Sequence, residues 1–222
     1  MKKIFALLLA AVMCFSLVAC GGGEKGNADK ITEESPATSI TEESPFTNIA
    51  VGDEVIFGNY NGDIKWIVLD VQEDHAVLLC KTAIAPKSNY SVDGTWHTSE
   101  MLSPMSMLAG RMFTDEQKNQ TMHPILDGEE SKGYMFLLNS EEVDTYMPGE
   151  DNEWRLAMAS ETAIKDGVKV YENAMGTGAY CNWILRDGAW VGGQRGNAGK
   201  IVNTTEQKYG YGIRPAIWVS IP

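Results

Sequence analysis

The sequence is poor in the residues that build metal centres. Among its 222 residues there are three histidines and four cysteines. His75, His97 and His123 each lack a second His, Cys or carboxylate at a metal-ligand interval on an expected helix. The acidic stretches 127–130 and 150–153 lack the alternating oxygen ligands of a calcium loop, so we expect solvated turns there. We therefore expect neither a metal nor another cofactor.

Positive charge is also scarce. The chain has 18 Lys and Arg residues against 30 Asp and Glu residues, a net charge of −12. Such a surface repels phosphate backbones, which excludes a nucleic-acid partner. The sequence also has no Gly-x-Ser-x-Gly elbow, phosphate loop or paired-carboxylate motif, so no standard catalytic pattern is present.

The long apolar run is confined to residues 4–18, which is short for a membrane-spanning helix. Lys2 and Lys3 precede this run, as in a secretory signal, and we assign residues 1–19 to a signal peptide. The run ends in Leu17, Val18, Ala19 and Cys20, a string similar to the bacterial lipobox. An ordinary cut near Ala19 is the alternative, and Cys14 is a poor rival because Met13 precedes it.

The lipobox predicts acylation of Cys20, which becomes the mature N-terminus. Two or more acyl chains give stable anchoring. We therefore expect a protein held on the outer face of the cell membrane by lipid, with membrane lipid as its first partner.

Residues 20–50 have the composition of a disordered acidic tether. They are rich in Gly, Glu, Ser, Thr and Pro and show no apolar periodicity, so they cannot bury enough surface to fold. A tandem copy, ITEESPATS followed by ITEESPFTN, occupies residues 31–48. As a random coil the tether spans about 30 Å. We expect residues 51–222 to form a single globular domain.

Two cysteines remain outside the signal and the lipidation site. Cys80 and Cys181 are compatible with one disulfide in an oxidising exterior. Cys80 lies in an apolar run, so a small buried thiol is the alternative.

Local patterns predict short elements throughout the domain. Three β-branched or aromatic runs separated by turn residues predict an antiparallel meander over 54–57, 64–71 and 76–79. Thr114 and Gln117 form a capping box that begins a short helix at Asp115. Further helices are expected from Pro104, over 141–147 and over 156–165. Further strands are expected over 134–138, 168–171, 182–185, 189–191 and 216–221.

The segment 180–218 is dense in large aromatic and arginine side chains. Interior Arg and Trp side chains interspersed with glycine are typical of a core built from irregular loops. Arg186 and Arg214 fit either a clamp for an anionic ligand or a buried network with carbonyls and carboxylates, and the second is favoured. Trp96, Trp183 and Trp190 fit either an aromatic platform or core anchors, and again the second is favoured.

Several motifs in order carry a family resemblance. The strings GDEVIFGNYNGDIKWIVLD, FLLNSEEV, WILRDGAW and GIRPAIWV resemble a bacterial extracellular domain family of unknown function, over about residues 51–222. Members of this family often follow a lipoprotein signal. The resemblance implies a structural core motif made of Trp183, Arg186, Trp190, Gly212, Arg214 and Trp218.

The last two strings are also similar, more distantly, to the formylglycine-generating enzyme superfamily. That similarity implies an α+β, C-type-lectin-like single domain with short antiparallel strands, few short helices and long loops. Oxidising members use a nearby pair of cysteines, and here Cys181 stands alone in that region. The oxidase chemistry therefore does not carry over.

The sequence favours a membrane-tethered recognition or adhesion module for an envelope or extracellular glycan, peptide or protein. Its expected ligand-binding face uses the loops 90–97 and 192–212, with Trp96, His97, Arg186 and Arg195. A structural envelope protein without a small ligand is one alternative. An extracellular enzyme on the same scaffold is the other, and no catalytic residue is assigned.

Overall fold

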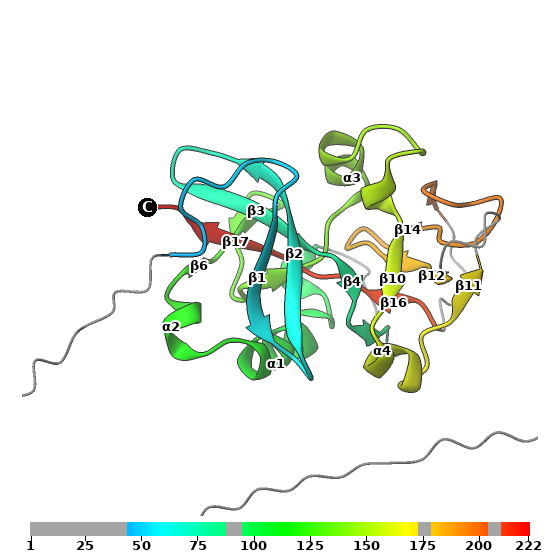
Figure 1. Ribbon diagram of the computed structural model, residues 1–222, viewed down its shortest axis with the longest axis horizontal. Coiled ribbons are helices and arrows are strands. Elements are labelled where there is room, and N and C mark those ends of the chain that lie inside the picture. The colour runs from blue at the N-terminus through cyan, green and yellow to red at the C-terminus, as the bar shows by residue number, and fades with distance from the viewer. Residues whose placement is uncertain (1–43, 88–94, 173–178, 204–209) are drawn as a thin grey trace, which may run out of the picture. The chain divides into compact units, whose positions relative to one another are not determined.

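The computed structural model describes residues 44–87, 95–172, 179–203 and 210–222. All of them belong to one compact unit, Glu42–Pro222. Within these ranges the chain forms strands β1 to β17, helices α1 to α4 and two short 3-10 helices. The fold class is α+β, with mostly antiparallel sheet pairings (Figure 1). The signal, the lipobox and most of the tether lie outside the described residues.

The first sheet contains the predicted meander. Strands β1 (Glu54–Asn59), β2 (Asp63–Val71) and β3 (His75–Cys80) pair antiparallel in chain order. Asn61 and Gly62 have positive φ, as the tight β1–β2 turn requires. The sheet continues with β17 (Ala216–Ser220), which pairs with β3, β6 (Thr121–Met122) and β9 (Met135–Phe136). The carboxyl-terminal strand is therefore held at the centre of this sheet.

Two smaller sheets and one hairpin complete the strands. One sheet has the order β11-β12-β10-β4, formed by Val170–Glu172, Ala179–Cys181, Ala157–Ala159 and Thr82–Ala83. The other has the order β15-β14-β13-β16-β5, formed by Ile201–Val202, Trp190–Val191, Trp183–Ile184, Gly212–Ile213 and Ala85–Pro86. The hairpin joins β7 (Ile125–Leu126) to β8 (Glu129–Glu130). Strands β11, β13 and β14 confirm the strands predicted over 168–171, 182–185 and 189–191.

The helices begin where capping residues place them. The Thr114 side chain and Gln117 form both bonds of the predicted capping box at α2 (Asp115–Lys118). Asn139 caps α3 (Ser140–Tyr146) in the same way, and Ser160 caps α4 (Glu161–Lys165). The remaining helices are α1 (Leu102–Met112) and the 3-10 helices η1 (Trp96–Thr98) and η2 (Glu153–Arg155).

The helix predicted over 156–165 is wrong in its first half. Strand β10 occupies that part, pairing parallel with β4 and antiparallel with β12. The apolar spacing fitted a helix, but pairing partners distant in sequence decide the local structure, and Ser160 delays the helix until Glu161.

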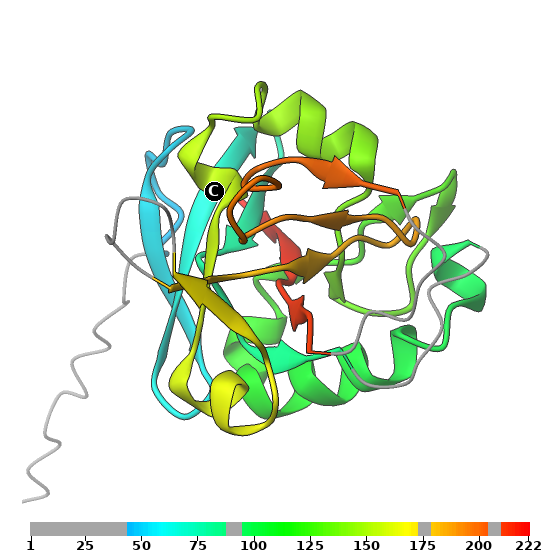
Figure 2. The same ribbon diagram turned by 90° about the vertical axis from the view of Figure 1, so that its right-hand side faces the viewer.

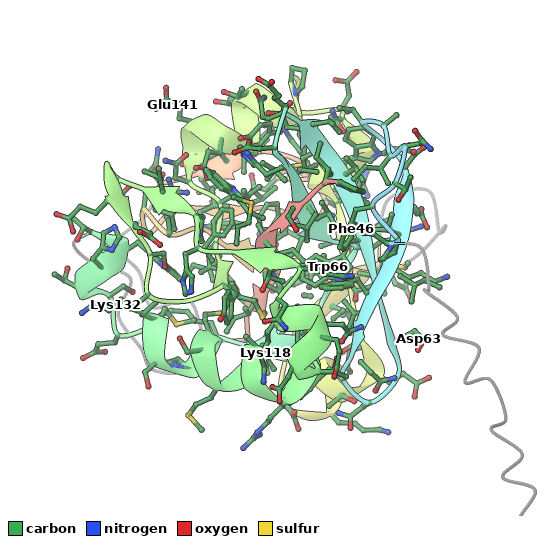
Figure 3. The ribbon with its side chains drawn as sticks, turned by 90° about the vertical axis from the view of Figure 1, so that its left-hand side faces the viewer. Phe46, Asp63, Trp66, Lys118, Lys132 and Glu141 are labelled. Carbon is green, nitrogen blue, oxygen red and sulfur yellow. The ribbon has the colours of Figure 1, made fainter. Side chains whose placement is uncertain are left out.

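The boundary predicted at Val51 is also too late. Phe46 is 1% exposed, and its ring packs edge-on against Phe57 with centroids 4.9 Å apart. Figure 3 shows Phe46 beside the first sheet, near the buried Trp66. The described part of the second copy of the tandem repeat, residues 44–48, therefore reaches the core.

The first sheet and the two smaller sheets lie side by side (Figures 1 and 2). Helices α1 and α2 accompany the first sheet, whereas α3 and α4 accompany the smaller sheets. Two of the connections between them, from β3 to β4 and from β16 to β17, lie next to each other. The crossings are joined by backbone hydrogen bonds from Cys80 to Pro215 (2.8 Å) and from Ile84 to Ile213 (2.9 Å). Residues on these crossings therefore lie where the sheets meet.

No helix in the described ranges is long and apolar enough to cross a membrane.

Candidate anion-binding cleft

The aromatic and arginine motif near the carboxyl end lies mostly in the interior. Its buried members are Trp183, Arg186, Trp190, Gly212 and Arg214. A Cβ on Gly212 would lie 2.5 Å from the Ala83 Cβ, so this close crossing of strands requires glycine. Trp218 differs from the others because it is only half buried and stacks on His75, with ring centroids 4.2 Å apart.

Arg186 belongs to a closed ionic network. Its guanidinium pairs with Glu142 and lies 3.6 Å from the Asp127 carboxylate, and Nη1 also donates to the Leu137 carbonyl. Asp127 accepts in turn from the backbone N–H of Trp96 at 3.0 Å. The structure therefore brings Arg186 and Trp96 together through Asp127, as interior supports.

The ligand-binding face predicted from sequence is not formed as expected. Trp96 is 1% exposed, and its indole N–H donates to the Ser131 hydroxyl, so its ring offers no platform. The His97 Nε2 is bonded to the Leu126 carbonyl at 2.7 Å. Arg195 is exposed and apart from this network. Residues 90–94 and 204–209 of the two predicted loops lie outside the described residues.

The two candidate disulfide cysteines are both free and buried. Burial raises the pKa of the Cys80 thiol to about 11 and that of Cys181 to about 12. Both groups therefore remain protonated near neutral pH. A protonated thiol is a poor nucleophile and a poor metal ligand.

Arg214 occupies the crossing from β16 to β17 and is fully buried. Its Nε donates to the Cys80 carbonyl at 2.7 Å, and one Nη1 hydrogen goes to the Trp154 carbonyl. The guanidinium carbon lies 5.1 Å from the centroid of the Trp183 ring, in a cation–π contact. These contacts hold the guanidinium in one orientation.

The charge of Arg214 nevertheless has no partner in the described part of the chain. No ion pair joins it to a described carboxylate, and its buried Nη2 makes no hydrogen bond. Burial lowers its pKa to about 10, so the side chain is still a cation near neutral pH. Burying an unpaired charge is costly, which makes this atom the place where an anion would stabilise the fold most.

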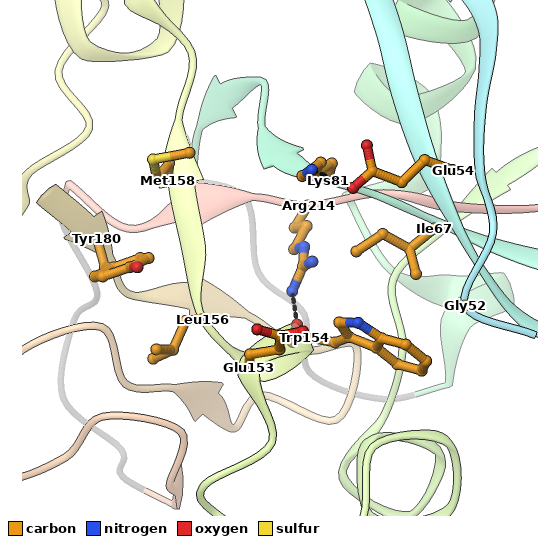
Figure 4. A pocket seen from close by; sticks show the side chains of 10 residues that line it. All are labelled: Gly52, Glu54, Ile67, Lys81, Glu153, Trp154, Leu156, Met158, Tyr180 and Arg214. Atoms are coloured by element: carbon orange, nitrogen blue, oxygen red, sulfur yellow. Dashed lines mark hydrogen bonds and ion pairs between the residues drawn. The ribbon is translucent and has the colours of Figure 1, made fainter. Parts of the chain in front are cut away.

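Arg214 lines a cleft of about 240 Å³, which we call the Arg214 cleft. Glu54, Ile67 and Lys81 line it from the side of the first sheet (Figure 4). The rest of the lining includes Glu153 and Trp154 from η2, Leu156 between η2 and β10, Met158 from β10 and Tyr180 from β12. Arg214 lies at the centre of these side chains (Figure 4). The cleft therefore forms where the two groups of sheets meet.

The charges at the cleft divide into a satisfied pair and two unpaired groups. Lys81 and Glu54 form an ion pair with each other. The Glu153 carboxylate is exposed and joins no ion pair or side-chain hydrogen bond among the described residues. With Arg214 at the centre, this arrangement can bind an anionic group by charge-assisted hydrogen bonds.

No family model, curated protein or solved structure matches this chain.

Another hollow of the described surface lacks an unpaired buried charge like that of Arg214. A second, larger hollow of about 690 Å³ lies between β1 and α2 and is lined by Pro45, Ile56, Phe57, Thr114 and Glu116, among others. It contains no buried charged side chain. Within the described ranges no group of three or more His, Cys, Asp or Glu side chains is placed to hold a metal ion.

Sequence reasoning named Arg214 but missed the walls of its cleft. Trp154, Met158 and Tyr180 come from separate short elements, and nothing in their local patterns indicates a shared surface. One signal for an unpaired charge was available in the sequence: the immediate neighbours of Arg214, which are Ile213, Pro215 and Ala216, supply no carboxylate.

Proposed function

We propose that this chain is a lipid-anchored extracellular recognition module that binds a small anionic ligand in the Arg214 cleft. The observation that carries the proposal is that Arg214, which lines the cleft, is fully buried and has an Nη2 without a hydrogen-bond partner. Arginine is suited to planar anions because its donors form a rigid fork. In Arg186 the corresponding charge is compensated by Glu142 and Asp127, so the two arginines have different tasks.

The cellular setting of the proposal rests on the sequence. The lipobox ending at Cys20 supports acylation and an anchor on the outer face of the membrane. Residues before Phe46 then act as the tether between lipid and domain. A ligand reaching the Arg214 cleft would come from the envelope or the medium.

The finer fold assignment is part of the same proposal. Short strands joined by long irregular segments support a C-type-lectin-like domain, distantly similar to the formylglycine-generating enzyme superfamily. Cys181 has no nearby cysteine in sequence, and its raised pKa keeps it protonated. These features favour binding over oxidation or nucleophilic catalysis.

The proposal is tested by direct binding to the full-length lipoprotein in detergent. Calorimetric titrations use acetate, glucuronate, the common L-amino acids, inorganic phosphate and sulfate. Met158→Trp places a bulky ring at the cleft wall, at a side chain that is 46% exposed and therefore tolerant of substitution. Met107→Trp is the matched control, because Met107 is 60% exposed and outside the cleft.

We expect saturable binding of at least one of these anions, lost at least tenfold in Met158→Trp and retained in Met107→Trp. The proposal fails when none of the anions binds, or when Met158→Trp binds as tightly as the unmodified protein.

A further inference from the structure

Four charged side chains line the Arg214 cleft, two cationic and two anionic: Glu54, Lys81, Glu153 and Arg214. The ion pair between Lys81 and Glu54 satisfies one of each sign. What remains is one buried cation, Arg214, and one exposed carboxylate, Glu153. A ligand that satisfies both must carry both signs of charge.

The geometry points to a small zwitterion as the ligand of this cleft, an amino acid whose carboxylate binds Arg214 and whose ammonium binds Glu153. This inference rests on the proposed function, and it narrows the anion to a carboxylate with an adjacent cationic group. Carboxylate and guanidinium match as parallel donor and acceptor pairs. An ammonium provides three donors to a carboxylate such as that of Glu153.

The backbone fixes Arg214 and Glu153 relative to each other. The Trp154 carbonyl, which accepts from Arg214 Nη1, belongs to the residue that directly follows Glu153. Helix η2 holds this pair in place, because the Trp154 N–H donates to the Asn152 side chain at 2.9 Å. Glu153 and Arg214 lie near this carbonyl in Figure 4. The capped turn therefore carries Glu153 and also accepts a hydrogen bond from Arg214.

The remaining lining limits the size and polarity of the ligand. A volume of about 240 Å³ corresponds to about eight water molecules at ~30 Å³ each, which suits a group of single amino-acid size. Trp154 and Tyr180 lie on opposite sides of Arg214 (Figure 4), and Leu156 and Met158 add apolar surface. An apolar or aromatic side chain on the ligand would therefore be accepted.

The charge count disfavours phosphate and sulfate ligands. The lining sums to zero formal charge, and the chain as a whole carries −12. A dianion would meet one unpaired guanidinium, with the unpaired Glu153 close by, and would be repelled by the surrounding field. A zwitterion adds no net charge to the cleft.

The test compares ligands that differ by one charged group. The common L-amino acids are screened by calorimetry against the full-length lipoprotein, and the tightest is compared with its deaminated and decarboxylated analogues. For L-phenylalanine these are 3-phenylpropanoate and 2-phenylethylamine, and phenyl phosphate serves as the dianion. We expect the amino acid to bind at least tenfold more tightly than each analogue, since each lost charged contact costs about a factor of ten or more.

Glu153→Gln provides the matched variant, and Glu129→Gln, at an exposed residue of β8 outside the cleft, is its control. Arg214 is left unchanged because its substitution threatens the fold. Glu153→Gln should weaken amino-acid binding about tenfold and should not weaken 3-phenylpropanoate binding, because it removes a negative charge near that anion. Glu129→Gln should change neither.

Two outcomes overturn the inference in distinguishable ways. The zwitterion is contradicted when 3-phenylpropanoate or phosphate binds as tightly as the amino acid. It is also contradicted when Glu153→Gln keeps the same preference for the amino acid over 3-phenylpropanoate. Either result leaves the cleft as a site for anions. Absence of binding by every probe removes the proposed function together with the inference.

Discussion

Three buried arginines show how one residue type is used in two ways. Arg155 pairs with Asp144 and donates to the Met147 carbonyl at 2.6 Å, and Arg186 pairs with Glu142. Arg214 alone among these three has carbonyls and a Trp ring around it but no carboxylate. Buried charges are normally paired, so the exception marks the functional candidate and the other two mark the framework.

The Arg186 network predicts a large effect of one neutral substitution. Glu142→Gln keeps a residue that can complete the capping box at α3 but removes the charge that compensates Arg186. We expect the free energy of unfolding to fall by about 2–4 kcal/mol, because Arg186 is left as a poorly compensated buried charge. Urea unfolding followed by circular dichroism measures the change.

The neighbouring Glu141→Gln is the control for that substitution. Glu141 occupies the same first turn of α3 but is exposed, so it shares the helix-dipole effect without the ion pair. A loss in Glu142→Gln no larger than that in Glu141→Gln would show that the Arg186 pair does not support the fold.

The two buried thiols predict a loss of stability at alkaline pH. Burial raises the pKa of Cys80 from 9.0 to about 11 and that of Cys181 from 9.0 to about 12. The folded state thus holds these protons more tightly than the unfolded state. Their contribution is complete below pH 9.0 and is lost as the pH rises toward about 11 and 12, at about 1.4 kcal/mol per pH unit for each thiol.

A double variant isolates this effect. Arg214, whose pKa burial lowers to about 10, acts with the opposite sign above that pH. The difference in unfolding free energy between the unmodified protein and Cys80→Ala with Cys181→Ala removes the burial effect on Arg214 and keeps only its charge coupling to the two thiolates. This difference should shrink as the pH rises above 9.0. A difference that stays constant across the range would contradict the assignment of raised thiol pKa values.

At the scale of elements, the sequence predicted the strands and helix ends that depend on residues close together in the chain. The meander follows from alternation and turn residues close in sequence, and the capping box at Thr114 is written in four consecutive residues. Strand β10 was mistaken for helix because its partners β4 and β12 lie far away along the chain. Contacts across such distances leave no local pattern.

The tandem repeat illustrates the same limit within two nearly identical segments. Its copies differ at the equivalent positions Ala37 and Phe46, and the aromatic side chain of the second copy is 1% exposed. A single apolar residue, Phe46, does not outweigh the polar composition around it, so the sequence alone assigns the segment to the tether. The burial of Phe46 places the described end of the second copy, residues 44–48, in contact with the core.

Phe46→Ala should therefore destabilise the domain substantially. Removing a buried phenyl ring costs about 3–5 kcal/mol from lost burial and the cavity that remains. Val51→Ala, at a side chain that is 55% exposed, should change stability by no more than about 0.5 kcal/mol. Thermal and urea unfolding of both variants measure the difference, and equal stabilities would return residues 44–50 to the tether.

At the scale of the whole molecule, the candidate site could not be assembled from sequence. The Arg214 cleft is lined by segments around residues 52–67, 81, 153–158, 180 and 214. Each contributes one to four residues with no shared motif, and the cleft forms where the crossings β3–β4 and β16–β17 lie side by side. Anion binding by Arg214 is one of two interpretations of the sequence, whereas the residues around Arg214 are brought together by the topology of the fold.

The lipid anchor is the remaining property of the whole molecule, and it depends on one residue of the lipobox, Cys20. We expect Cys20→Ser to abolish acylation and to release the protein from the membrane fraction, because one or no acyl chain gives only weak, reversible binding. Cys14→Ser, which changes the cysteine preceded by Met13, should leave both acylation and membrane association intact. Mass spectrometry of the mature amino terminus and fractionation of cells expressing each variant provide the measurements. Membrane association of Cys20→Ser at the unmodified level would mean that the domain is held by something other than lipid on this cysteine, and an unacylated Cys20 would return the signal to the ordinary secreted class.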